Sequence, residues 1–162
     1  MKAPTLGEIK HAYFNLMADA LSPRKPVREQ TMAVLLGVVP GVRTWSNFAL
    51  RETLVQTRYS DTIDVTQIIL HLNSPVWAMH WAGRYDPEAI PLVRESVYNA
   101  CREMEFYGGR GRPSVRQGNL SYSNRIDRDL MNDFCGEEYV MEGERVRGSV
   151  RYCGWALLGE KS

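Results

Sequence analysis

Two stretches of the chain share one pattern of apolar and polar positions. Residues 68–83 (IILHLNSPVWAMHWAG) and 139–154 (YVMEGERVRGSVRYCG) align over sixteen residues without a gap. In each, a short polar turn separates two runs of strand-like character, and the second run has an aromatic residue two places before a final glycine. Apolar residues at alternate positions are typical of strands. The pattern therefore predicts a β-hairpin that is used twice.

The alternation also assigns side chains to the two faces of the first hairpin. Residues 64–72 place one set on one face (Thr66, Ile68, Leu70, Leu72) and a second set on the other (Val65, Gln67, Ile69, His71). With a turn at Asn73-Ser74, we expect three large side chains beside the Ile68 and Leu70 face, buried in the core: Trp77, Met79 and Trp81.

In the last strand, the same alternation separates Val146, Val150 and Tyr152 from Arg147, Ser149 and Arg151. We expect Glu138 to be a cross-strand partner of these arginines.

Helical patterns precede and separate the hairpins. Thr5 and Glu8 have the spacing of a capping box, and apolar residues recur at helical spacing behind them, which predicts a helix over Leu6–Leu21. Pro26 suits the start of a second helix that ends at Gly37, and Thr44 suits the start of a third over residues 44–54. After Asp86-Pro87, an apolar stripe predicts a long helix over residues 87–107.

These elements predict an α+β fold with two parts. Residues 1–56 would form a small N-terminal helical unit. Residues 57–162 would form an antiparallel sheet built from the duplicated hairpin, with helix 87–107 packed on it.

Composition favours an intracellular protein with one main core. The chain has 162 residues, of which 44% are hydrophobic, and a net charge of +1. The cysteines (Cys101, Cys135 and Cys153) are odd in number and lack CxxC spacing, which favours reduced thiols in the cytoplasm. No apolar run is long enough for a membrane span, and residues 1–12 lack the core of a signal peptide.

Charge is unevenly distributed along the second half of the chain. No acidic residue lies between Glu105 and Asp127, whereas no basic residue lies between Arg128 and Arg145. The basic segment contains GGRGRPSVRQG with aromatic residues on both sides. Its arginines and glycines suit an anion or a nucleotide, unless they only pair with the acidic segment that follows. With three residues of the sheet, they form the predicted binding set: Arg110, Arg112, Arg116, Tyr122, Arg125, His80, Arg147 and Arg151.

The sequence carries no catalytic, metal or cofactor motif. The histidines and cysteines lack the spacing of a zinc site, and no serine stands in a GxSxG setting. An acidic group (Asp127, Asp129 and Asp133) fits a solvated turn better than a calcium loop, because Met131 occupies a ligand position.

Several motifs in order resemble an uncharacterised bacterial domain that often follows helix-turn-helix repressor modules. They are PVWAMHWAG, Phe106 with the 109–113 turn, Gly118, Tyr122, Asn124, Asp127, Phe134, Glu137, and Tyr152 with Gly154. The resemblance covers residues 59–157 and implies the doubled hairpin, but no activity. Residues 30–56 also resemble a short helical module at the start of bacterial and plasmid proteins, through Gly37, Trp45 and Phe48.

These observations favour a non-catalytic binding or regulatory protein, of a bacterial mobile element, that recognises a protein partner or an anionic ligand. One alternative is a nucleic-acid-binding regulator that uses the 106–125 segment. Another is a small-molecule enzyme or nucleotide sensor with a pocket that contains His80 and Arg151.

Overall fold

The computed structural model describes residues 2–22, 41–56 and 61–158, in which helices and runs of strands alternate along the chain. In chain order they are α1 (Leu6–Leu21), β1 (Gly41–Trp45), β2 (Phe48–Gln56), β3 (Ile63–His71), β4 (Ser74–Tyr85), the 3-10 helix η1 (Pro87–Ala89), α3 (Ile90–Arg102), β5 (Ser114–Gln117), β6 (Leu120–Leu130), β7 (Asp133–Glu142) and β8 (Arg145–Ala156).

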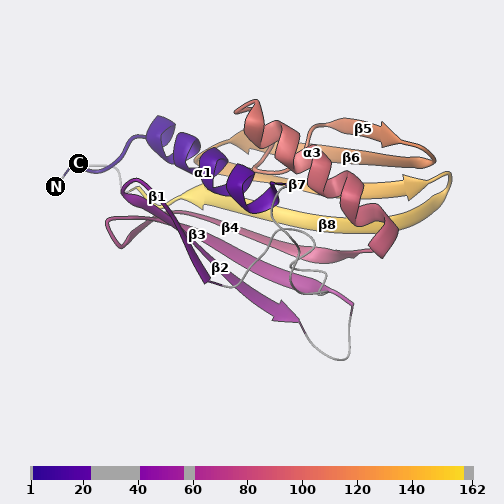
Figure 1. Ribbon diagram of the computed structural model, residues 1–162, viewed down its shortest axis with the longest axis horizontal. Coiled ribbons are helices and arrows are strands. Elements are labelled where there is room, and N and C mark those ends of the chain that lie inside the picture. The colour runs from indigo at the N-terminus through magenta and orange to yellow at the C-terminus, as the bar shows by residue number, and fades with distance from the viewer. Residues whose placement is uncertain (1, 23–40, 57–60, 159–162) are drawn as a thin grey trace.

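The strands form one antiparallel sheet of eight strands in the order β1-β2-β3-β4-β8-β7-β6-β5. Both helices lie on the same side of this sheet (Figure 1). We call this side the helix-covered face. The other side, on which no described helix lies, is the open face. The α+β class and the antiparallel sheet agree with the sequence prediction.

Helix α1 begins at the predicted capping box. Thr5 accepts a hydrogen bond from the backbone of Glu8, and the Glu8 side chain accepts one from the backbone of Thr5. One stripe of α1 is buried against the sheet and α3: Ile9, Ala12, Tyr13, Leu16, Met17 and Leu21. Burial of each large side chain contributes roughly 1.5–3 kcal/mol, so tertiary packing stabilises this helix more than its own propensity does.

The helix-covered face holds the aromatic core, but not with the partners expected from the alternation. Trp81 lies opposite Val65 on β3, and Trp77 lies opposite Ile69. The large side chains therefore share the face of Val65 and Ile69 rather than that of Ile68. The turn residues are Leu72 and Asn73, one position earlier than predicted, and an irregularity between Ile69 and Leu70 shifts the pairing further.

The predicted third helix is wrong, because residues 44–54 belong to β1, a turn and β2. In β2, Phe48 and Leu50 are buried on the helix-covered face, and the next position of this alternation is the buried Glu52. This carboxylate bonds to Arg43 and Gln67, so a charged residue occupies a core position and hides the strand period. The predicted second helix lies outside the described residues.

Strand β2 pairs with β3 from Phe48↔His71 to Gln56↔Ile63. The described residues before position 57 therefore contribute strands to the main sheet, in addition to a helix. The boundary predicted at residue 56 falls between two paired strands.

The helix predicted over residues 87–107 is shorter than expected. It consists of η1 and α3 and ends at Arg102, and Met104 has a left-handed φ of 57°. The arginine-rich stretch that follows contains β5, which pairs with β6 at the edge of the sheet.

The β3–β4 and β7–β8 hairpins agree in detail. The turn residues, Leu72-Asn73 and Gly143-Glu144, occupy the same positions when residues 68–83 are aligned with 139–154. The pairing irregularities of the two hairpins, after Ile69 and after Val140, also fall at the same position of this alignment. Strands β4 and β8 pair with each other around Trp81↔Tyr152, which are also matched residues. Matched residues of the two stretches thus occupy matching places in the two hairpins.

Gly154 provides a test of the close packing between β8 and the side chain of Phe134 on β7. A Cβ added there would lie 2.1 Å from Cζ of the buried Phe134, so we expect Gly154→Ala to lower the free energy of unfolding by about 1–3 kcal/mol. Urea unfolding measures this value. Gly7→Ala is the control, because its nearest neighbour would be 3.8 Å away, and it should not destabilise the protein. Equal stability of the two variants would contradict the close contact.

Candidate functional site

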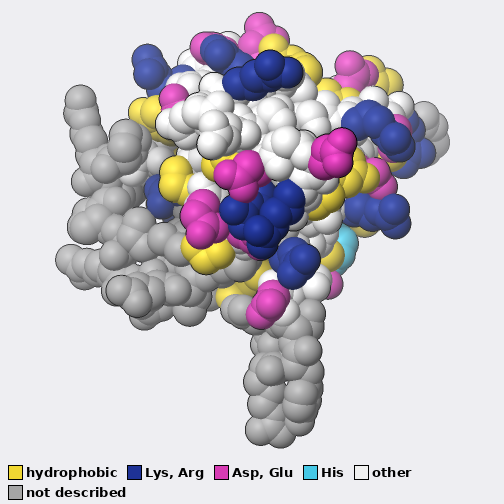
Figure 2. All heavy atoms as spheres, turned by 90° about the vertical axis from the view of Figure 1, so that its right-hand side faces the viewer, with side chains coloured by type: hydrophobic (Ala, Val, Ile, Leu, Met, Phe, Trp, Pro, Cys, Tyr) yellow, Lys and Arg dark blue, Asp and Glu magenta, His cyan; other side chains and the backbone are white. Residues whose placement is uncertain are grey.

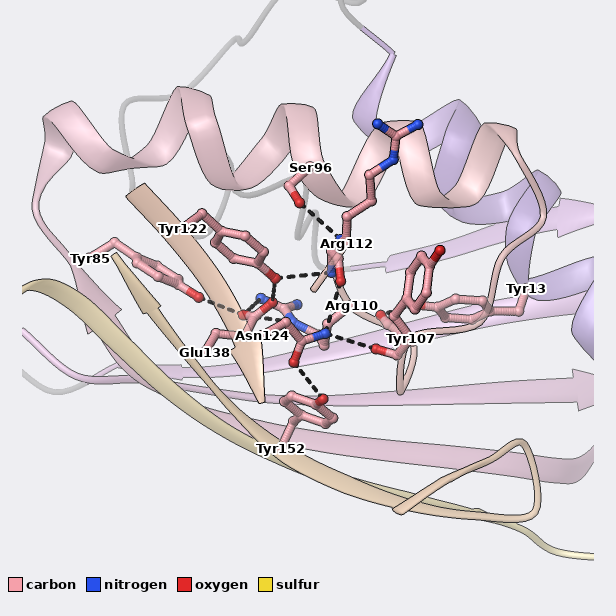
Figure 3. A network of polar contacts seen from close by, with 12 residues as sticks. Tyr13, Tyr85, Ser96, Tyr107, Arg110, Arg112, Tyr122, Asn124, Glu138 and Tyr152 are labelled. Carbon is pink, nitrogen blue, oxygen red and sulfur yellow. Dashed lines mark hydrogen bonds and ion pairs between the residues drawn. The ribbon is translucent and has the colours of Figure 1, made fainter. Parts of the chain in front are cut away.

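A buried ion pair between Arg110 and Glu138 lies at the centre of the helix-covered face (Figure 3). Oε2 of Glu138 accepts hydrogen bonds from Nε of Arg110 at 3.0 Å and from Nη2 at 2.7 Å. The hydroxyl of Tyr85 donates to the same oxygen at 2.6 Å, and the hydroxyl of Tyr122 donates to Oε1. The carboxylate is thus bonded from three sides, and its side chain is 0% exposed.

Further hydrogen bonds hold the backbone on both sides of Arg110 in place. Asn124 donates to the carbonyl oxygens of Tyr107 at 3.0 Å and Gly111 at 2.8 Å. The hydroxyl of Tyr152 donates to Oδ1 of Asn124 at 2.7 Å. The 107–111 segment is therefore fixed to β6 and β8.

Electrostatics keeps both partners charged. Burial alone would raise the pKa of Glu138, but the charge of Arg110 and the hydrogen bonds from Arg110, Tyr122 and Tyr85 outweigh it and hold that pKa below its usual value of 4.5. Burial would lower the pKa of Arg110, yet the Glu138 carboxylate raises it above its ordinary value. Burial also raises the pKa of Tyr85 and Tyr122, so both stay protonated and donate.

Two consecutive glycines turn Arg110 inward. Gly108 and Gly109 have φ values of 63° and 69°, a region that side chains disfavour. The carbonyl of Gly109 accepts a hydrogen bond from the hydroxyl of Tyr13 in α1. The guanidinium of Arg110 lies 4.9 Å from the ring of Trp81, so a cation–π contact adds to the ion pair.

The predicted binding set is thereby divided between the interior and the surface. Arg110 is 5% exposed and Tyr122 is 0% exposed, so an external ligand does not reach them. Arg112 pairs with Glu103, and Arg116 is exposed on β5. The sequence interpretation grouped these residues as one binding segment, a loop with aromatic residues on both sides, whereas the structure buries Arg110 and Tyr122.

Arg147 lies near the β7–β8 turn. It bonds to Glu142 at 2.6 Å and to Asp86 at 3.1 Å, and its side chain is mostly buried. The surface on the side shown in Figure 2 likewise carries basic and acidic side chains next to each other, without a continuous basic area.

The other three residues of the set, His80, Arg125 and Arg151, lie on the open face. Here a hollow of about 480 Å³ lies over the centre of the sheet and contains both His80 and Arg151. It is lined by residues from β4, β6, β7 and β8: His80, Ala82, Asp127, Cys135, Gly136, Glu137, Arg151, Tyr152 and Cys153. This is the candidate functional site.

Cross-strand register explains why these side chains meet. One row runs across three strands through His80, Cys153 and Cys135. The neighbouring row runs through Arg151 and Glu137 and continues to Arg125 on β6. Residues directly opposite on one face of a sheet are in side-chain contact range, so the rows bring these polar groups together.

The partner of Arg151 is Glu137, and not Glu138 as predicted. Nε of Arg151 lies 2.7 Å from Oε1 of Glu137, because the irregularity between Val140 and Met141 sets the register of β7 on β8. Nη2 of Arg125 lies 4.0 Å from the same carboxylate. Both arginines remain exposed, Arg151 by 84% and Arg125 by 69%, so their pairing does not close the hollow.

His80 is held from β3. Its Nδ1 lies 3.4 Å from the hydroxyl of Thr66 and 3.6 Å from Oδ1 of Asp64. The imidazole is 43% exposed and borders the hollow.

Among the described residues, no group of three or more histidine, cysteine or acidic side chains is arranged to hold a metal ion. None of the described helices is long and apolar enough to cross a membrane. No family model, no curated protein and no solved structure matches this chain. The resemblances noted in the sequence stay predictions.

Sequence reasoning missed two features of the site. It treated Glu138 as a surface partner, although its position next to Glu137 already placed the two carboxylates on opposite faces of a strand. It also treated Cys135 and Cys153 separately, whereas they lie directly opposite each other on β7 and β8.

Replacement of Arg110 should strongly destabilise the folded protein. Arg110→Met leaves a buried carboxylate without its counter-charge, so we expect the free energy of unfolding to fall by about 3–5 kcal/mol near neutral pH. Arg112→Met is the matched control, because it removes an exposed pair and should lower the free energy of unfolding far less. Urea unfolding of both variants measures the difference.

The same variants give a pH test. The lowered pKa of Glu138 stabilises the native protein above pH 4.5 and loses this effect as the pH falls below that value. In Arg110→Met, Glu138 is expected to become protonated and neutral in acid. The stability difference from the natural protein should then shrink, and a constant difference would contradict the role of this charge.

Proposed function

We propose that this protein is a non-catalytic binding protein whose ligand occupies the hollow on the open face. The supporting observation is the position of His80 and Arg151, which border one concave surface and remain accessible there. An arginine fork gives charge-assisted hydrogen bonds to carboxylate or phosphate oxygens. In Arg151, Nε lies 2.7 Å from Glu137 and the side chain is 84% exposed.

The charges of the lining restrict the ligand. Asp127 and Glu137 border the hollow together with Arg151 and His80. A polyanion would meet these two carboxylates at close range. A small ligand with one anionic group toward Arg151 and His80, and a hydrogen-bond donor toward the carboxylates, is a better match.

The proposal includes the duplicated hairpin. Its support is the shared place of the turns and irregularities, and the pairing of β4 with β8 around matched residues. In that alignment His80 and Arg151 are also matched positions. Each hairpin then supplies one candidate donor to the hollow.

The alternative of nucleic-acid recognition through the 106–125 segment has less support. Arg110 and Tyr122 are buried, and Arg112 pairs with an acidic side chain. A small-molecule enzyme would use the same hollow. A protein partner, a regulatory role and an origin in a mobile element stay predictions from the sequence.

Ligand screening tests the proposal directly. We expect a carboxylate or phosphate compound, from a panel that includes amino acids and nucleotides, to raise the unfolding temperature; at a hundredfold excess over Kd it adds about 2.7 kcal/mol of stability. Arg151→Ala should weaken binding about tenfold to hundredfold, because it removes a charged hydrogen bond. Calorimetry measures Kd.

Arg116→Ala is the matched control for this experiment, because Arg116 is exposed on the edge strand β5 and not part of the hollow. It should leave Kd unchanged. An equal loss of affinity in both variants would show a general charge effect, and a panel without any stabilising compound would refute the proposal.

A salt titration tests the nucleic-acid alternative. Since the accessible charges are of both signs, we expect no measurable binding of single-stranded DNA or RNA at physiological salt, by fluorescence anisotropy. Binding that falls steeply with salt and weakens in Arg116→Ala would instead support that alternative. Arg110→Ala is unsuitable here, because it would disturb the core.

A further inference from the structure

We propose that Cys135 and Cys153 are a redox-active pair that forms an intrachain disulfide in the floor of the hollow. The expected co-reactant is a low-molecular-weight disulfide such as oxidised glutathione. The two residues are directly opposite on β7 and β8, both are free thiols, and both are partly exposed. The proposal does not depend on the ligand suggested above.

The hydrogen-bond pattern of the sheet shows which type of cross-strand pair they form. The backbone N–H of Ala156 donates to the carbonyl of Asn132, so these two residues are a hydrogen-bonded pair between β8 and the start of β7. Hydrogen-bonded and non-hydrogen-bonded pairs alternate along an antiparallel ladder. From Ala156 the pairs Trp155↔Asp133, Gly154↔Phe134 and Cys153↔Cys135 follow in order, so the cysteines form a non-hydrogen-bonded pair.

This position suits a disulfide. Residues of a non-hydrogen-bonded pair have Cα atoms about 4.5 Å apart and their side chains are close. Disulfides span Cα separations of roughly 4.4–6.8 Å, so the bond needs no large movement of either strand. Both side chains extend from the open face, where the hollow gives a small disulfide access to them.

The third cysteine is a contrasting case within the same chain. Cys101 lies in α3 and is 3% exposed. Burial raises the pKa of its thiol to about 12, which disfavours the reactive thiolate. It should not react in the native protein.

The reaction proceeds by two exchanges. The thiolate of one cysteine attacks a sulfur of glutathione disulfide, a mixed disulfide forms, and one glutathione leaves as a thiolate. The thiolate of the other cysteine then attacks the protein sulfur of the mixed disulfide, and the second glutathione leaves. Two protein thiols are oxidised, one glutathione disulfide is reduced to two glutathione thiols, and both thiol protons pass to glutathione.

Peptide mapping after oxidation tests this. The native full chain is incubated with oxidised glutathione, the remaining thiols are alkylated, and trypsin is added. We expect peptide 129–145 joined to peptide 152–161 by a disulfide, with Cys101 alkylated. The linked peptides should be equally abundant in Cys101→Ala.

Single variants provide the kinetic comparison. Cys135→Ser and Cys153→Ser should accumulate the glutathione mixed disulfide, because no neighbouring thiol resolves it. The natural protein should hold at least about tenfold less of it, since an adjacent thiol attacks at a high effective concentration. Urea unfolding confirms that each variant is folded, and the mapping of the natural protein does not depend on them.

Three results would contradict the proposed disulfide. Glutathione on Cys135 and Cys153 without a link between them would overturn the proposal, as would a disulfide that includes Cys101. Formation of the linked peptides only after unfolding in urea would also overturn it, because the pair would then not be accessible or close in the native sheet.

Discussion

The structure depends on one buried charge pair. Arg110 reaches inward from the segment after α3, and Glu138 reaches toward it from β7. Neither charge would be tolerated alone in the core, since a buried ion without a partner costs several kcal/mol. Tyr85 of β4 and Tyr122 of β6 donate further hydrogen bonds to the carboxylate oxygens of Glu138. The pair and its tyrosines thus connect the segment after α3 to β4, β6 and β7 inside the core.

The two faces of the sheet therefore carry different kinds of polar groups. The helix-covered face contains the aromatic core and a polar network whose carboxylate is fully bonded, and the side chains of this ion pair are buried away from any external ligand. The neighbouring residue on the same strand, Glu137, points to the open face and pairs with Arg151. There the charged side chains remain exposed, next to a histidine and two thiols. Adjacent glutamates therefore have opposite roles because they lie on opposite sides of one strand.

The prediction of the fold succeeded where the hydrophobic period was undisturbed. The capping box and apolar stripe of α1 and the alternation of β7 and β8 are local signals, and the structure has elements at those places. The prediction of a helix over 44–54 was wrong because Glu52 occupies a buried strand position. A sequence pattern counts a carboxylate as a surface residue, and only its contacts with Arg43 and Gln67 explain its burial.

The sequence by itself determined the hairpins, the first helix and the presence of His80 and Arg151 on strands of one sheet. Only the tertiary structure decided that Arg110 is internal and that Cys135 lies opposite Cys153. The physical reason is register. A single pairing irregularity between Val140 and Met141 moves the β8 partner of Val140 and of every earlier β7 residue by one position, and no local preference encodes such a shift. The position of Arg110 likewise depends on a carboxylate 28 residues away in the chain.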